Sequence, residues 1–299
     1  MEKLTKRDES ISSLDPHKLR ILLTDLVDIY SPSGKEGEIL DYLYQYLRNY
    51  DIPVRRQHID ENRYNLIVAP SDDENQIALI GHVDTVTAYD LDSYQSEEQG
   101  NIIYGLGTAD MKSGCAAMVE AYVHAWKATN GSLPAALALV VGEEEEGDGA
   151  RTLVQDYHFP WIIIGEPTEL QPCFNHYGYV EIQLTTEGER MHASLANKKQ
   201  NPVETMLRIL LELTEHMTRT WPDLVYNIRD LFSPPGGFVV PEYCEVWIDT
   251  HLPPNAPIGK ITLELEEVVD SYQLENPGTD ICLRFTTIHA GYDIPVKGS

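Results

Sequence analysis

The hydrophobic residues recur every three or four positions in several stretches, which predicts amphipathic helices. Asp15 followed by Pro16 is typical of a helix start, because aspartate caps free N–H groups and proline fits the first turn. Ser33 is expected to cap the next helix, with Glu36 three residues later completing a capping box. The helices expected from this spacing cover residues 15–29, 33–47, 115–127, 151–157, 201–213 and 258–272.

Short apolar runs between polar and glycine-containing segments predict buried strands in the first half of the chain. Residues 90–100 are polar and are expected to form a loop. Because strands alternate with helices here, we expect an α/β fold, a mostly parallel sheet sandwiched by helices. The expected strands cover residues 53–59, 65–69, 77–82, 102–104, 135–141 and 161–164.

The pattern changes near Tyr177. Residues 180–185 alternate between apolar and polar, as in a half-buried strand, and further strands are expected at 239–248 and 281–288. With the two later helices these strands form two βαβ-like halves. We therefore expect an inserted, smaller α+β (ferredoxin-like) domain with helices on one face. The expected division is 1–178, then 179–290, with 291–299 returning to the first domain.

Composition narrows the possible partners. The chain has 22 Lys and Arg against 48 Asp and Glu, a net charge of −26, which disfavours nucleic acid and anionic membranes. Its four cysteines are far apart and indicate no disulfide framework. No apolar stretch approaches the ~18 residues of a membrane span, and residues 1–13 lack the apolar region of a secretory signal. The expected location is the cytoplasm.

Chemically active side chains follow the ends of the expected strands. Gly81 is followed by His82, and Asp84 lies two residues on, so both side chains point to the same side. Two further strands end in glycine and glutamate, at Glu143 and Glu166. In open α/β sheets the ligand site lies beyond the carboxyl ends of the strands, so these groups are expected to share one rim.

One histidine with several carboxylates is a ligand set for Zn²⁺, Mn²⁺ or Co²⁺ rather than a sulfur-rich structural zinc site. Two ions ~3.5–4 Å apart, bridged by one carboxylate, would neutralise the acids and supply an activated water. Each element alone has a plainer explanation: Asp110 could cap a helix, and the glutamate run at 143–146 could be a solvated loop. Their joint order favours the metal site.

Four motifs in this order resemble the aminoacylase/glutamate-carboxypeptidase family of co-catalytic zinc peptidases and deacylases, which includes acetylornithine, acetyl-lysine and succinyl-diaminopimelate amidohydrolases. The match covers essentially the whole chain. The motifs are Gly81-His82-Val83-Asp84-Thr85-Val86, Tyr104 to Gly114 around Asp110, Glu143-Glu144, and Gly165-Glu166-Pro167-Thr168.

The resemblance implies two divalent metal ions, zinc first and cobalt or manganese as alternatives. It implies His82 and Glu166 on the first ion, with Asp84 supporting His82. It implies Asp110 as the bridge, often followed by a cis peptide bond. It assigns Glu143 as general base on the bridging water and Glu144 as ligand of the second ion. The four-glutamate run leaves a second register, Glu144 and Glu145, open.

The smaller domain resembles the lid and dimerisation domain of this family. Gly188-Glu189-Arg190-Met191-His192 is similar to a motif whose histidine reaches the active site of the other subunit and helps bind the oxyanion. A purely structural role for His192 stays open. A homodimer through the small domain is therefore expected.

Two departures from the family pattern matter. His251 stands where the family has an arginine that commonly binds the substrate carboxylate, so an acidic group would be bound otherwise or be absent. The family continues beyond the position of Ser299, with the last strands of the catalytic sheet and a final histidine ligand. We therefore expect a truncated chain or an incomplete second metal site, and His289 is a poor substitute.

The expected function is metal-dependent hydrolysis of an amide bond in a small N-acyl amino acid or dipeptide, with no nucleic-acid or membrane partner. The alternative from another class is a catalytically inactive, truncated metal-binding scaffold of the same fold that dimerises. Metal stoichiometry together with amidase activity distinguishes the two.

Overall fold

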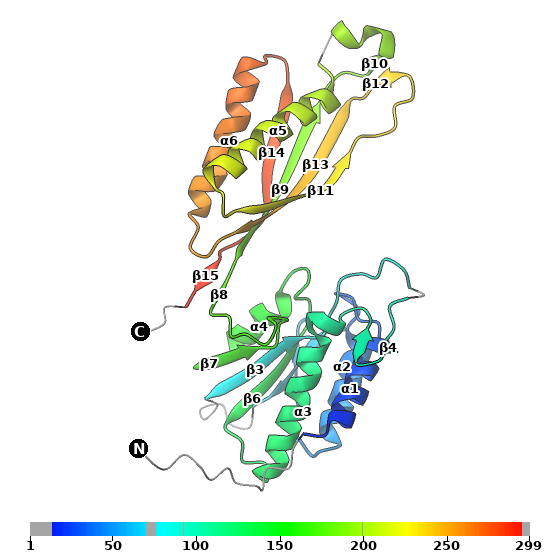
Figure 1. The fold of residues 1–299 in the computed structure, drawn as a ribbon, viewed down its shortest axis with the longest axis vertical. Coiled ribbons are helices and arrows are strands. Elements are labelled where there is room, and N and C mark those ends of the chain that lie inside the picture. Colours follow the sequence, from blue (N-terminus) through cyan, green and yellow to red (C-terminus); the bar gives the residue numbers. More distant parts are fainter. Residues whose placement is uncertain (1–13, 70–75, 92, 199, 295–299) are drawn as a thin grey trace. The chain divides into compact units, whose positions relative to one another are not determined.

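A computed structural model describes residues 14–69, 76–91, 93–198 and 200–294. The chain divides into two compact units, Met1–Leu170 and Gln171–Ser299, and each is described by itself (Figure 1). The second unit begins before the expected boundary at residue 178, because the short strand β8 (Asn175–His176) pairs with β15 (Tyr292–Asp293) at the other end of the same unit.

The first unit is built on a five-stranded sheet in the order β1-β2-β6-β3-β7. The β6–β3 and β3–β7 pairs are parallel, whereas β1–β2 and β2–β6 are antiparallel. The α/β class is confirmed, with a mixed sheet whose parallel half carries β3. The strands are β1 (Arg55–His58), β2 (Tyr64–Val68), β3 (Ile77–His82), β6 (Ala135–Val140) and β7 (Trp161–Ile164).

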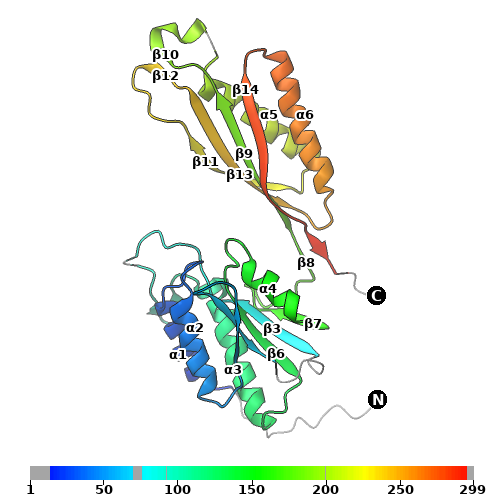
Figure 2. The ribbon, with the colours of Figure 1, turned by 180° about the vertical axis from the view of Figure 1, so that it is seen from behind.

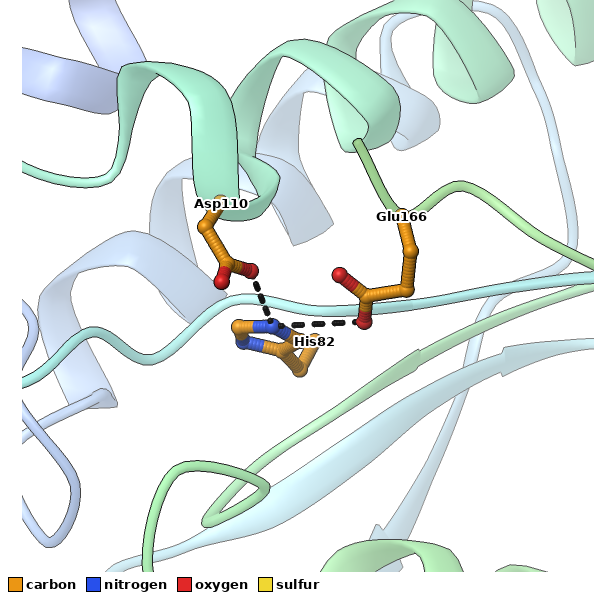
Figure 3. Close-up of side chains that lie close together, drawn as sticks. All are labelled: His82, Asp110 and Glu166. Atoms are coloured by element: carbon orange, nitrogen blue, oxygen red, sulfur yellow. Dashed lines mark hydrogen bonds and ion pairs between the residues drawn. The ribbon is translucent and has the colours of Figure 1, made fainter. Parts of the chain in front are cut away.

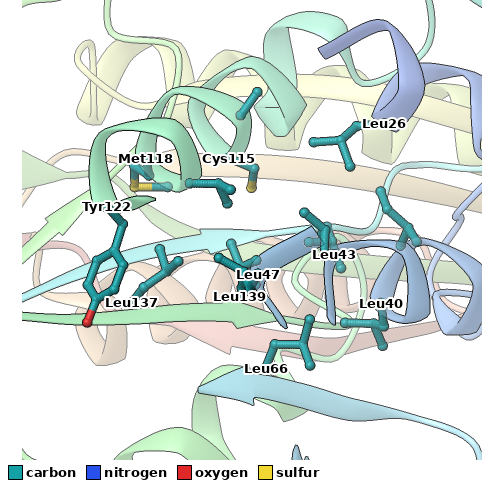
Figure 4. Packing of buried hydrophobic residues seen from close by; sticks show 14 of the residues in the cluster. Leu26, Leu40, Leu43, Leu47, Leu66, Cys115, Met118, Tyr122, Leu137 and Leu139 are labelled. Carbon is teal, nitrogen blue, oxygen red and sulfur yellow. The ribbon is translucent and has the colours of Figure 1, made fainter. Parts of the chain in front are cut away.

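Helices cover both faces of this sheet. Successive side chains along a strand point to opposite faces, so β2, β3 and β6 each contribute apolar residues to both. Leu66 and Leu137 pack into a core with three helices on one face (Figure 4). On the other face, Ile67 and Ala136 pack with Leu153 of the fourth helix. The larger core also buries leucines of both N-terminal helices. The helices are α1 (Pro16–Asp28), α2 (Gly37–Arg48) and α3 (Ser113–Ala128) on the first face, and α4 (Asp148–Asp156) on the second.

Three local expectations for the first unit were wrong. Ser33 does not cap α2: Glu36 occupies the N-cap without a side-chain cap bond, and the Ser33 hydroxyl donates to Asp84 instead. Strand β7 is not buried, since its four residues are 48–71% exposed at the edge of the sheet. The expected loop contains β4 (Glu97–Gln99), which pairs with β5 (Ile102–Tyr104).

The second unit contains a four-stranded antiparallel sheet in the order β11-β13-β9-β14 (Figure 2). Two helices pack on one face, so the order of elements is the βαββαβ arrangement expected for a ferredoxin-like domain. These elements are β9 (Gly178–Glu187), α5 (Pro202–Thr220), β11 (Val225–Phe232), β13 (Tyr243–Leu252), α6 (Ile258–Glu275) and β14 (Asp280–His289).

Strand β11 was not expected, and the strand expected at residues 239–248 is divided into β12 (Val239–Val240) and β13. Strand β12 pairs with β10 (Met191–His192), which precedes a 3₁₀ segment (Ala193–Lys198). None of the helices in the described residues has the length and apolar character needed to cross a bilayer.

Candidate metal centre

Strand β3 delivers His82 to the carboxyl end of the sheet, where the side chain is almost fully buried. Its Nδ1 lies 3.0 Å from the main-chain oxygen of Asp84 and 3.5 Å from Asp84 Oδ1. The neutral tautomer that this arrangement favours keeps the proton on Nδ1 and leaves the Nε2 lone pair free for a metal ion.

Three carboxylates surround Nε2 of His82. Asp110 Oδ1 lies at 3.2 Å, Glu166 Oε1 at 3.6 Å and Glu143 Oε2 at 3.7 Å. Figure 3 shows the carboxylates of Asp110 and Glu166, from two different chain segments, directed at the same nitrogen of the imidazole. Within the described residues, ligand atoms of His82, Asp110 and Glu166 all lie within 4.8 Å of one another, and Glu144 is outside that group.

The chain segments that carry Asp110 and Glu166 meet through two glycines. Asp110 lies in a kinked segment (Thr108–Lys112) that leads into α3; its own backbone is not helical, with φ −116° and ψ 103°, and the Asp110–Met111 peptide bond is cis. At the start of α3, a Cβ added to Gly114 would come 2.0 Å from the main-chain oxygen of Gly165. The two glycines therefore allow α3 to approach the end of β7, where Glu166 follows.

A Gly114→Ala substitution is expected to destabilise the first unit by about 1–3 kcal/mol, because the methyl group must displace backbone rather than a flexible side chain. Gly37→Ala is the matched control: it also lies in the first turn of a helix, and nothing stands within 4 Å of its added Cβ. That control should be neutral or stabilising. Urea unfolding measures both, and equal effects would contradict the proposed close approach.

The loop after β6 is tied to the histidine through Asp84. Asp84 Oδ2 accepts the Glu144 N–H at 3.0 Å and the Ser33 hydroxyl at 2.7 Å. The Glu144 side chain is half-buried, whereas Glu145 is exposed. This geometry favours the register with Glu143 and Glu144 at the site. The role of Ser33 was missed, because its Ser-Pro-Ser-Gly context is typical of a turn and a helix cap.

The electrostatics of the site favour a cation. Burial lowers the pKa of His82, but Asp84 and the neighbouring carboxylates outweigh it and raise that pKa to about 9. Burial and the charge of Asp110 raise the pKa of Glu166 to about 7, although His82 opposes the shift. The pKa of Glu143 is raised by burial and by nearby carboxylates, again against His82. The surrounding carboxylates therefore favour a positive charge at Nε2 of His82, from a proton or from a metal ion.

The donor set fits divalent metal ions. A buried imidazole nitrogen held in one tautomer faces carboxylate oxygens of three separate chain segments, which is a nitrogen and oxygen set suited to zinc, cobalt or manganese. A bound ion would replace the histidine proton and relieve the repulsion among the acids. His82, Asp110 and Glu166 could hold one ion, and Asp110 with Glu144 could contribute to a second.

Three histidines singled out in the sequence lie in the second unit, and the expected role of His192 as an oxyanion donor stays a prediction. The Ser194 N–H donates to Nδ1 of exposed His192, so the neutral ring carries its proton on Nε2. His251 is exposed and its ring lies 5.4 Å from that of Tyr179. Tyr179 lies on β9 between β13 and β14, and its cross-strand partner on β14 is His289, the last residue of that strand.

Sequence comparison matches residues 78–284 to the model of peptidase family M20/M25/M40, a segment that contains all the metal-centre residues. The chain belongs to this family. A probable succinyl-diaminopimelate desuccinylase of Staphylococcus epidermidis is 29% identical over 204 residues, which cover 65% of this chain and 50% of the relative. The chain thus spans about half the length of the curated relatives that it matches first.

Solved structures share the fold at low sequence identity. A tripeptidase from Staphylococcus aureus superposes with a TM-score of 0.74 at 17% identity, covering 96% of this chain and 80% of the other. The Bacillus subtilis YXEP protein, described as a dinuclear metal-binding peptidase of the M20 family, gives 0.64 at 12% identity, covering 94% and 76%. These likenesses support the fold assignment.

Proposed function

We propose that the protein is a metal-dependent amidohydrolase that uses two divalent ions and Glu143 as general base. One observation carries the proposal: Nε2 of a buried, oriented His82 faces carboxylates of Asp110, Glu143 and Glu166 at 3.2–3.7 Å. Three chain segments supply these acids, so the fold brings the charges together, which is costly without a cation. Family membership and the dinuclear relative support the same reading.

In this proposal, bound ions supply Lewis-acid polarisation of the substrate carbonyl and lower the pKa of the attacking water. Glu143 takes the proton of that water and passes it to the departing amine. Its side chain is 51% exposed, so it can reach substrate, and its raised pKa suits a group that must hold a proton between two steps. Asp84 holds His82 in position and fixes the Glu144 main chain.

The proposed substrates are small N-acyl amino acids or short peptides. A relative named as a desuccinylase supports the first class, and a solved tripeptidase of the same fold supports the second. His251 in place of the family arginine argues against a bidentate contact to a substrate carboxylate. We therefore expect a higher ratio of activity on neutral or amidated substrates to activity on acidic substrates than in enzymes that have the arginine.

The test combines metal titration with a substrate panel. The protein is stripped with a chelator and titrated with Zn²⁺, Co²⁺ or Mn²⁺. It is then assayed on N-acetyl and N-succinyl amino acids and on dipeptides. Two bound ions with ion-dependent amide hydrolysis are expected. At most one ion and no hydrolysis of any substrate would instead favour the inert dimeric scaffold.

We also propose a homodimer through the second unit, in which Nε2–H of His192 donates to the oxyanion in the partner's site. The exposed edge strand β11 supports this dimer, since Val225, Leu231 and Phe232 on it are 50–57% exposed. Light scattering should give twice the chain mass. A concentration-independent monomer would remove this part of the proposal.

A further inference from the structure

The loop of residues 142–147, here called the glutamate loop, is held at both of its ends by side chains from β2 and the turn before it. Asn65 is fully buried: its Oδ1 accepts the Val141 N–H at 3.3 Å, and its Nδ2 donates to the Gly149 oxygen at 2.8 Å. One amide group therefore bridges the residue before the loop and a residue just after it. Arg63 lies in the turn directly before β2, two positions ahead of Asn65.

Arg63 contacts the exit of the glutamate loop directly. Its Nη2 lies 2.5 Å from Asp148 Oδ2, and its Nη1 lies 3.4 Å from Asp148 Oδ1. The guanidinium also lies against the entrance of the loop: a Cβ added to Gly142 would come 3.1 Å from Nη1 and 2.3 Å from Asp148 Oδ1. A side chain at Gly142 is disfavoured both by these short distances and by the φ of +67°, which favours glycine.

The guanidinium is itself held in place by two further acids. Its Nε donates to Asp60 Oδ2 at 2.7 Å, and Nη1 lies 3.8 Å from Oε1 of Glu36. Glu36 is completely buried, and neither of its carboxylate oxygens has a hydrogen-bond partner among the described residues. Burial raises the pKa of Glu36, and the nearby Arg63 partly opposes that shift. The Arg63 side chain is only 19% exposed.

We propose that Arg63 is a positioning residue for Glu143 and Glu144. The glutamate loop has three anchors: Asp84 holds its middle through the Glu144 N–H, Asn65 holds the backbone on both sides, and Arg63 holds Asp148 at its exit. Arg63 is the anchor that uses a charged side chain: it pairs with Asp148 at the exit, and its guanidinium lies in the space that a side chain on Gly142 would enter. The inference rests on the proposed function only in naming Glu143 and Glu144 as the groups that must be placed.

Arg63→Lys tests this role, because lysine keeps the charge beside Glu36 but cannot form the two-pronged contact with Asp148. The readout is hydrogen exchange of two amides in the glutamate loop. The Glu144 N–H donates to the Asp84 side chain, and the Gly147 N–H donates to the main-chain oxygen of Gly142. We expect exchange there to accelerate at least about tenfold, as for the loss of a charge-assisted hydrogen bond, with β3 and β6 unchanged.

Arg56→Lys is the matched control on the same hairpin. Arg56 pairs with Asp41 at 3.0 Å and lies over the rings of Tyr44 and Tyr64, away from the glutamate loop. It should leave loop exchange unchanged. Asp148→Asn is the second test variant, for the case that Arg63→Lys does not fold, and should accelerate the same amides. The proposal would be overturned by unchanged exchange in the loop, or by exchange that accelerates equally throughout the first unit.

Metal binding and turnover give a second readout. Arg63→Lys should weaken binding of the second equivalent of Co²⁺ by about 10- to 100-fold, the usual effect of removing a support behind a ligand, and lower kcat more than it changes KM. Retained affinity for the second ion together with unchanged kcat would count against positioning. If the parent protein binds no metal and hydrolyses nothing, the proposed function fails, while hydrogen exchange still decides the role of Arg63.

Discussion

Glu143→Gln is expected to retain its metal ions and to lose amide hydrolysis by about 10²- to 10⁴-fold in kcat. Glutamine has nearly the same size and keeps an oxygen near Nε2 of His82, but it cannot accept the proton of the attacking water. The proposed ligands His82, Asp110 and Glu166 are unchanged in this variant, so the ion stoichiometry should not change. Steady-state kinetics with metal analysis of the same preparation measures both quantities.

Two neighbouring variants make this result specific. Glu146→Gln removes one charge from the same exposed run and should keep the parental kcat. Glu145→Gln distinguishes the two registers: it should be silent if Glu143 and Glu144 serve the site, and should lose an ion if Glu144 and Glu145 do. Parental turnover in Glu143→Gln would exclude it as the general base.

The parts of the fold that could be predicted are those with local causes. Asp15 caps its helix as expected, because an acid before proline satisfies the first free N–H groups, and Asn201 caps α5 in the same way. Strand β11 was missed because Arg229 forms a bulge between Ile228 and Asp230, which breaks the alternation that would have marked a strand. Arg229 instead binds Asp249 and Glu181, partners that are distant in sequence.

Burial of β7 was predicted wrongly for a different reason. Trp161 to Ile164 is apolar throughout, and such a run indicates a strand with both faces covered. Whether a strand lies in the middle or at the edge depends on the order of strands, which composition does not encode. In the described residues β7 pairs only with β3 and stands at the edge.

The site illustrates the same limit. The strand-end motifs predicted that His82, Glu143 and Glu166 share one rim, and the order of the motifs added Asp110; the structure brings these residues together around Nε2 of His82. Asp84 was expected to support His82, but the roles of Ser33 and Arg63 were not predicted. A hydroxyl three residues before a glutamate, as at Ser33, is equally typical of a helix cap. The contacts of Arg63 with Asp148 and of Ser33 with Asp84 join residues 51 to 85 positions apart. Such pairings arise from the assembled sheet.

Asp110→Ala is expected to abolish most of the stabilisation that divalent ions give the protein. Ions bound only by the folded state stabilise it by about 4 kcal/mol per site at a thousandfold excess over Kd, which raises Tm by several degrees. As the proposed bridge, Asp110 contributes to both sites, so its loss should reduce the ion-induced rise in Tm to a small fraction of the parental value. Thermal unfolding with and without added Zn²⁺ measures the difference.

Without ions, Asp110→Ala is not expected to lower the Tm of the protein. The charge of Asp110 helps to raise the pKa values of Glu143, Glu144 and Glu166, so in chelator the alanine variant loses like-charge repulsion together with one contact to His82. Because Asp110 is 56% exposed, solvent screens these terms, and Tm in chelator should not fall. Glu38→Ala, an exposed acid on α2, should keep the full ion-induced rise. A full rise in Asp110→Ala would exclude this carboxylate as a ligand, whereas a drop in Tm in chelator alone would make it a structural acid.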